Sequence, residues 1–193
     1  MTPTTKLEAV NIMLSSIGET PVNSLTSGLV DAEMAETILE AINRDVQSQG
    51  WHFNTEINFA MAPEATTGNI MLPKNTLRVD TTAEDVEKDY VQRGRKLYDR
   101  ANHTFNIGKT IKLELVLLLD FEEIPEAARR YITLKAARTF QDRVVGSTDL
   151  HGFQERDEVF ALVELKDAEG MTADHNIFDN YGVYRVLDRY IKG

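Results

Sequence analysis

Four histidines and two groups of carboxylates are the side chains in this 193-residue sequence whose types suit catalysis or metal binding. His52, His103, His151 and His175 are scattered, and none has the paired spacing that usually supplies part of a zinc site. The sequence has no cysteine, so thiolate metal ligands and disulfides are excluded. We therefore predict no metal site, no cofactor and a fold that is stabilised by packing alone.

The carboxylates gather in two short stretches, Asp80, Glu84 and Asp85, and Asp120, Glu122 and Glu123. A glycan hydrolase uses two carboxylates that lie roughly 5 to 10 Å apart across the sugar bond. Proximity in sequence does not supply that geometry, and the second group also suits a helix start, where negative side chains meet the positive end of the dipole. The sequence has no nucleophile elbow, phosphate-binding loop or dinucleotide fingerprint. We predict no catalytic residue, with hydrolysis of a glycan as the alternative.

Two sets of side chains are typical of protein interfaces. The first is a basic edge on one expected helix, formed by Arg129, Arg130, Arg138 and Arg143. Arginine makes bidentate pairs with carboxylates across protein contacts, although a solvated helix face has the same composition. The second set lies near the end of the chain and consists of Tyr181, Tyr184, Leu187 and Tyr190. Aromatic residues anchor interfaces, so we predict docking of this segment on another chain, with folding back on its own domain as the alternative.

The formal net charge is −10, from 31 acidic and 21 basic side chains. A protein that grips nucleic acid needs a basic contact face, and this composition favours the opposite. The longest apolar stretch, residues 113–121, contains two carboxylates and is too short to span a membrane. Residues 1–6 have no basic segment followed by an apolar one, so we expect no secretion signal.

The first 50 residues predict an antiparallel helical hairpin. Thr5 and Glu8 have the spacing of a capping box, and Gly18 suits the end of the first helix. A second helix is expected from near Asp31 to Gly50. The apolar residues recur at helical spacing in both segments: Leu7, Val10, Leu14 and Ile17, then Met34, Ala35, Ile38, Leu39, Ile42 and Val46.

The stretch 51–120 is expected to be rich in β-structure. Trp51, Phe53, Ile57 and Phe59 alternate with polar residues, which predicts a half-buried strand. A short strand is expected at residues 77–79. Hairpins are expected at residues 89–100, with the turn near Gly94, and at residues 104–119, around Gly108.

Helical spacing returns after residue 120. A helix is expected from Ile124 to Gly146 with apolar residues at intervals of four: Ala128, Ile132, Ala136 and Phe140. Asp149 is expected to cap a last helix that reaches about Gly170 and carries Phe153, Phe160, Leu162 and Val163. We therefore predict an α+β fold in which residues 1–50 and 121–173 form an antiparallel helical bundle. Residues 51–120 form a β-rich insertion, and residues 174–193 form a C-terminal docking tail.

Several segments together resemble the tail tubular protein A family of T7-like short-tailed bacteriophages. They are residues 14–22 (LSSIGETPV), 41–44 with 50–54, 90–94 with 97–100, 124–126 with 131–132 and 135–138, and 176–179 (NIFD). The resemblance follows the order of the family over nearly the whole chain and is weakest at residues 60–85.

This resemblance implies a structural protein of the virion neck that is assembled in the cytoplasm of the bacterial host. Such a head-to-tail adaptor forms a dodecameric ring between the portal protein and the tubular nozzle protein, tail tubular protein B, and supports the tail fibre protein. Phage DNA passes through the ring without specific binding, and the acidic charge of the chain suits that passage. The alternatives are a virion-associated hydrolase acting on host surface glycan and a regulatory protein-binding module.

Overall fold

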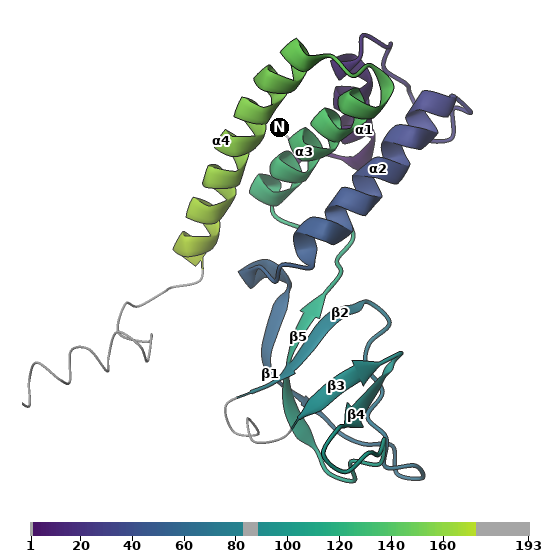
Figure 1. Cartoon of the computed structure of the whole chain (residues 1–193), viewed down its shortest axis with the longest axis vertical. Helices are drawn as coiled ribbons and strands as arrows, with labels where there is room; N and C mark the ends of the chain where they lie inside the picture. Colours follow the sequence, from purple (N-terminus) through teal and green to yellow (C-terminus); the bar gives the residue numbers. More distant parts are fainter. Residues whose placement is uncertain (1, 83–88, 173–193) are drawn as a thin grey trace, which may run out of the picture.

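A computed structural model of the chain describes residues 2–82 and 89–172. Within these residues, four α-helices form a bundle at one end of the molecule and five strands form a β module at the other (Figure 1). The chain crosses between the two parts after the second helix and again before the third (Figure 1). The predicted α+β class, with N- and C-terminal helices around central strands, is confirmed.

The bundle consists of α1 (Lys6–Ser16), α2 (Val30–Gln47), α3 (Glu126–Val144) and α4 (Thr148–Thr172). The capping box is confirmed, because the Thr5 N–H donates to Glu8 Oε2 at 2.8 Å and the Glu8 N–H donates to Thr5 Oγ1 at 3.2 Å. The four apolar residues predicted at intervals of four in α3, from Ala128 to Phe140, are all buried in the core. The largest fully buried side chains of the bundle are Met13, Leu14, Leu39, Ile124, Ile132 and Phe140.

The β module contains β1 (Thr55–Met61), β2 (Thr76–Thr81), β3 (Tyr90–Arg93), β4 (Lys96–Asp99) and β5 (Ile111–Leu117). An antiparallel sheet has the order β1-β5-β2, and β3 and β4 form a separate hairpin. Alternate residues of β5 point to one side and pack with that hairpin in a second core. This core consists of Ile70, Leu72, Tyr90, Leu97, Ile111, Leu113 and Leu115.

Two predicted hairpins have different outcomes. The hairpin at residues 89–100 is confirmed, with Gly94 at the turn in a left-handed conformation (φ 61°). The hairpin around Gly108 is wrong, since residues 104–106 make only isolated bridges and β5 pairs with β1 and β2 instead. Periodicity indicated a strand at residues 111–117 correctly, but it carries no information on which distant strand is the partner.

The half-buried strand predicted from Trp51 is also wrong at its start. Residues His52–Asn54 form one turn of 3₁₀-helix, and the strand begins at Thr55. A register shift between Glu56 and Phe59 then interrupts the alternation, and Ile57 and Phe59 are exposed. A β-bulge inserts one residue and shifts the following side chains relative to the partner strand, so a period of two does not persist through it.

Candidate assembly surfaces

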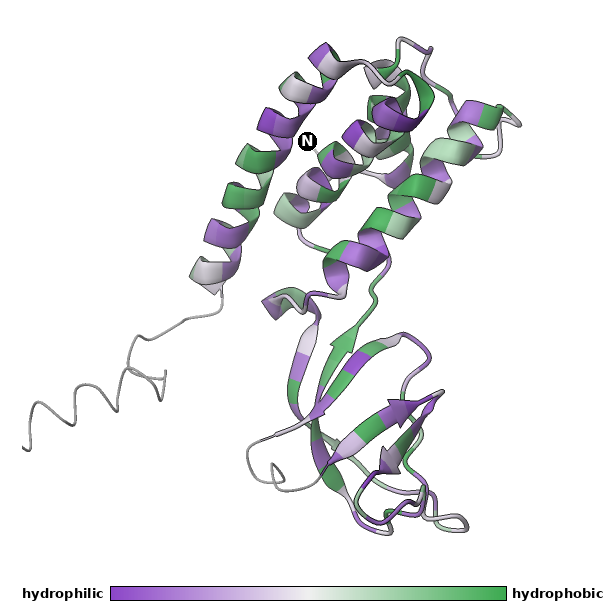
Figure 2. Cartoon of the chain, viewed as in Figure 1, coloured by the Kyte–Doolittle hydropathy of each residue, from purple (hydrophilic) through white to green (hydrophobic). Residues whose placement is uncertain are grey.

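Helix α4 has a long face of exposed apolar side chains. Of its 25 residues, Ala161 and Leu165 are the buried hydrophobic ones, and both belong to the bundle core. Phe153 and Phe160 lie on the same side of the helix, two turns apart, and they are 67% and 61% exposed. Figure 2 shows hydrophobic segments along the middle of this helix. A row of large exposed apolar side chains is a feature of surfaces that another protein covers.

The predicted last helix is therefore present, and its predicted apolar residues differ from one another in burial. Phe153, Phe160 and Val163 are exposed, whereas Leu162 is half-buried against the core. The helix begins at Thr148, and the Ser147 hydroxyl, rather than the Asp149 carboxylate, accepts from the Leu150 N–H at 3.4 Å. Because α4 packs mainly against α3, the described residues cover only a narrow strip of its surface.

Two arginines of α3 form ion pairs with carboxylates of α4. Arg138 Nε donates to Glu158 Oε2 at 2.6 Å, and Arg138 Nη1 lies 3.6 Å from Asp142 Oδ2. The hydrogen bond to Glu158 raises the pKa of Arg138 above its ordinary value, against the opposing effect of burial. Arg130 Nη1 forms an exposed ion pair with Glu164 Oε2 at 2.9 Å. Two of the four arginines predicted at an interface therefore already pair with α4 of the same chain.

The other two arginines lie in different environments. Arg129 is buried, and its guanidinium donates to the carbonyl oxygens of Ile124 and Thr4, at 2.8 and 2.9 Å, and to that of Glu122. It therefore ties the start of the chain and the segment before α3 to the bundle, which is a role within the chain. Arg143 is exposed in the last turn of α3 and stays a predicted interface residue. The predicted tail residues Tyr181, Tyr184, Leu187 and Tyr190 lie outside the described residues.

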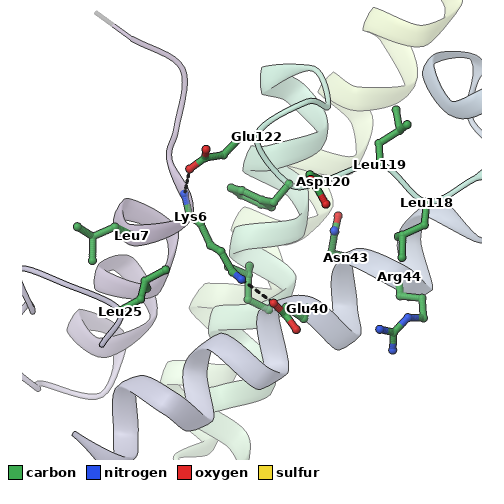
Figure 3. A pocket seen from close by; sticks show the side chains of 12 residues that line it. Lys6, Leu7, Leu25, Glu40, Asn43, Arg44, Leu118, Leu119, Asp120 and Glu122 are labelled. Carbon is green, nitrogen blue, oxygen red and sulfur yellow. Dashed lines mark hydrogen bonds and ion pairs between the residues drawn. The ribbon is translucent and has the colours of Figure 1, made fainter. Parts of the chain in front are cut away.

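A hollow of about 560 Å³ lies between α1, α2 and the segment before α3 (Figure 3). Lys6 Nζ extends into it and contacts Glu36 Oε1 at 2.7 Å and Glu40 Oε1 at 2.5 Å. Burial lowers the pKa of Lys6, but the hydrogen bonds and ion pairs with the two glutamates outweigh it, and the pKa is raised above its ordinary value. A lysine that two carboxylates keep protonated joins α1 to α2 through ion pairs and is not suited to act as a general base.

The β module exposes apolar side chains on an edge strand. Within the described residues β1 pairs with β5 alone, at the edge of the sheet, and its Ile57 is 65% exposed. On the β3–β4 hairpin the Arg93 guanidinium stacks 3.7 Å from the centre of the Tyr98 ring. Sequence periodicity treated Ile57 as a core residue, and no signal in the sequence alone identified it as exposed.

The two predicted carboxylate groups differ in how much of each the structure describes. Near the start of α3, Glu123 Oε2 accepts from the Asp120 N–H and Glu122 Oε1 from the Lys6 N–H, both at 3.4 Å. In the other group, Glu84 and Asp85 lie outside the described residues. No cluster of three or more potential metal ligands occurs in residues 2–82 and 89–172. In the same part of the chain, no helix combines the length and apolarity needed to cross a membrane.

Two comparisons with known proteins agree on the same family. The family model described as "Tail tubular protein" matches residues 7–175, which include all the helices and strands of both parts except the first residue of α1. The chain is similar to tail tubular protein A of Klebsiella phage KP34, with 27% identity over 163 residues. That alignment covers 84% of this chain and 86% of the phage protein.

Proposed function

The chain belongs to the tail tubular protein family and is a structural protein of a phage tail, and we propose that it is the head-to-tail adaptor of the virion. In this role several copies form a ring, dodecameric in the complete neck, between the portal protein and the tubular nozzle protein. The ring also supports the tail fibre protein and is assembled in the cytoplasm of the host. DNA passes through it during ejection without being bound.

The exposed apolar face of α4 is the observation that carries this proposal. The described part of the chain leaves Phe153, Phe160 and Val163 exposed, and apolar surface in water costs about 25 cal/mol for each Å². A ring subunit covers such a face with its neighbour. A closed ring requires two unlike surfaces on each subunit that fit one another, and the exposed apolar face of α4 is suited to be one of them.

The charge of the chain supports passage of DNA. A formal net charge of −10 leaves no general attraction for the phosphate backbone, whereas a basic channel would bind DNA with an affinity that depends strongly on salt. We propose no catalytic role, since the carboxylates near the start of α3 accept hydrogen bonds from backbone N–H groups. Nothing in the described residues favours the alternative of a glycan hydrolase.

Reconstitution tests the proposal directly. The purified chain is mixed with the portal and nozzle proteins of the same phage, and the products are imaged by electron microscopy. We expect a ring of this chain between the portal and the nozzle, and no joined particle when the chain is omitted. Portal–nozzle particles that form without the chain, or that exclude it, would contradict the adaptor role.

A matched pair of variants tests the α4 face in the same assay. Phe160→Ser removes an exposed apolar side chain, and Lys166→Ser changes an exposed polar residue of the same helix. We expect the first variant to fold normally and to give several-fold fewer joined particles. The second should behave as the unaltered chain. Equal yields from the two variants would mean that the α4 face lies outside the subunit contacts.

A further inference from the structure

A groove of about 660 Å³ runs between α1, α3 and α4 on the outside of the bundle. Its apolar lining comes from all three helices and includes Ile12, Leu134, Phe160 and Val163. Ile12, Phe160 and Val163 are exposed there, so the groove is an apolar surface that the described residues leave open. We call it the α4 groove.

The rim of the α4 groove is acidic. Among the described residues that line it, the charged ones are the carboxylates of Glu126, Asp157 and Glu164 and one cation, Arg130. Arg130 is already paired with Glu164 at 2.9 Å, and Glu126 accepts two hydrogen bonds from Thr4, at 2.8 Å from its N–H and at 2.5 Å from its hydroxyl. Asp157 is exposed at the edge of the groove. A ligand of this groove should therefore be apolar on one side and basic on the other.

The sequence of residues 181–192 (YGVYRVLDRYIK) has that composition. Its basic residues Arg185, Arg189 and Lys192 outnumber the one acidic residue, Asp188. Five apolar or aromatic residues recur with the spacing i, i+1, i+4, i+7, i+8, which in a helix would place them on one face: Val183, Tyr184, Leu187, Tyr190 and Ile191. An amphipathic segment that inserts its apolar face into a groove is a common mode of peptide recognition.

We propose that in the assembled ring the α4 groove binds residues 181–192 of the neighbouring copy of this chain. The apolar side chains of the segment cover Phe160 and Val163, and its basic side chains lie over Asp157 and Glu164. This inference rests on the proposed function, because a closed ring requires each copy to present two complementary, unlike surfaces. The groove and the segment form such a pair, and each copy has both.

The length of chain after α4 is sufficient for this exchange. The described part of the chain ends at Thr172, and eight residues separate it from Tyr181. Eight extended residues span up to about 26 Å. The segment can therefore bind at a site up to about that distance from the end of α4, and an adjacent subunit in contact with the bundle would present its groove within this range. Docking in its own groove would bury the same surfaces but would link no copies to one another, and we assign the segment to the neighbour for that reason.

The absence of cysteine from the sequence allows a clean cross-linking test. The full chain is prepared with Val163→Cys in the groove and Val186→Cys in the segment, assembled with portal and nozzle, and treated with a short bismaleimide. The same treatment is applied to the concentrated chain alone. We expect a ladder of covalent oligomers from the double variant, and dimers only from an assembled mixture of the two single variants. The control replaces Val163→Cys with Val30→Cys, which is exposed at the start of α2, and should give no ladder.

Three results would overturn the proposal: an internally cross-linked monomer as the main product, cross-links to portal or nozzle alone, or no specific cross-link. Charge reversal gives a second test, in which Asp157→Arg should lower the oligomer yield several-fold. Glu155→Arg, a matched change at an exposed position of α4 outside the groove lining, should not. A ladder from a chain that fails to join portal and nozzle would contradict the adaptor role and leave the groove assignment intact. Joined particles without a ladder would contradict the groove assignment and leave the adaptor role intact.

Discussion

Gln47 pairs through its side chain with the backbone of Leu119, 72 residues later in the sequence. The Leu119 N–H donates to Gln47 Oε1 at 2.8 Å, and Gln47 Nε2 donates to the Leu119 carbonyl at 2.9 Å. The side-chain amide thus takes the place of a neighbouring strand at the point where the chain returns from the β module to the bundle. Gln47 is fully buried at the end of α2, so these bonds are shielded from water.

Gln47→Leu should destabilise the protein by about 2 to 4 kcal/mol. The substitution keeps the volume but leaves the Leu119 N–H and carbonyl without the partners they now have, and a buried unpaired polar group costs roughly 1 to 3 kcal/mol. Urea denaturation followed by circular dichroism measures the change. Gln49→Leu, at an exposed position two residues later, serves as the control and should change stability by less than about 0.5 kcal/mol. Similar midpoints for the two variants would contradict the role assigned to Gln47.

Trp51→Ala should destabilise the fold by roughly 3 kcal/mol, near the lower end for a large aromatic residue because the side chain is half-buried. Trp51 packs on the bundle core, and its indole N–H donates to the Val46 carbonyl at 2.8 Å. Trp51→Phe keeps most of the packing and loses the hydrogen bond, so we expect a smaller loss of about 1 kcal/mol. If both variants had the same denaturation midpoint as the unaltered protein, Trp51 would not stabilise the junction between the bundle and the β module.

Arg129→Lys should cost about 2 to 4 kcal/mol, since one ammonium group cannot replace a guanidinium that donates to three carbonyl oxygens from two separate segments. Arg130→Lys is the matched control, because Arg130 is exposed and forms a surface ion pair of small value. Thermal melting of the two variants gives the comparison. A lower melting temperature for the Arg130 variant than for the Arg129 variant would reverse our assignment of the two residues.

The helices were predictable from the sequence because their apolar spacing persists for three or more turns. Ala128, Ile132, Ala136 and Phe140 are an example, and all four are buried. The same spacing predicted α4 as a helix, but it gave no information on which surface covers the apolar face of that helix. Phe153 and Phe160 follow the helical period, yet they are exposed, since periodicity does not distinguish a face covered by the same chain from one covered by a partner.

The candidate site was predictable only in part for a related reason. Arg129 and Arg130 are adjacent in sequence and identical in type, but they lie on different sides of α3. The Arg129 side chain is buried and Arg130 is exposed, a difference of about 100° around the helix. Arg129 donates to the carbonyl of Thr4, 125 residues earlier in the sequence, and a long-range contact of this kind leaves no mark in local composition.

The isolated chain should be mostly monomeric at micromolar concentration and low salt. Identical subunits with a net charge of −10 repel one another until a partner offsets the repulsion. Raising the salt concentration shortens the range of that repulsion, so association should increase with salt. Sedimentation velocity over a salt series measures the distribution. A stable ring at low salt without portal or nozzle would contradict this expectation.

Deletion of residues 176–193 should leave the bundle and the β module folded but impair assembly of the neck. The buried residues that form the two cores lie within residues 9–165, and we therefore expect both cores to form without the deleted segment. The α4 groove would then stay open in every copy, with Phe160 and Val163 in water. Thermal melting and electron microscopy of portal–nozzle mixtures give the two readouts. A large fall in melting temperature would mean that the segment belongs to the core of its own chain. Normal assembly of a stable truncated protein would mean that docking of this segment is not needed to build the ring.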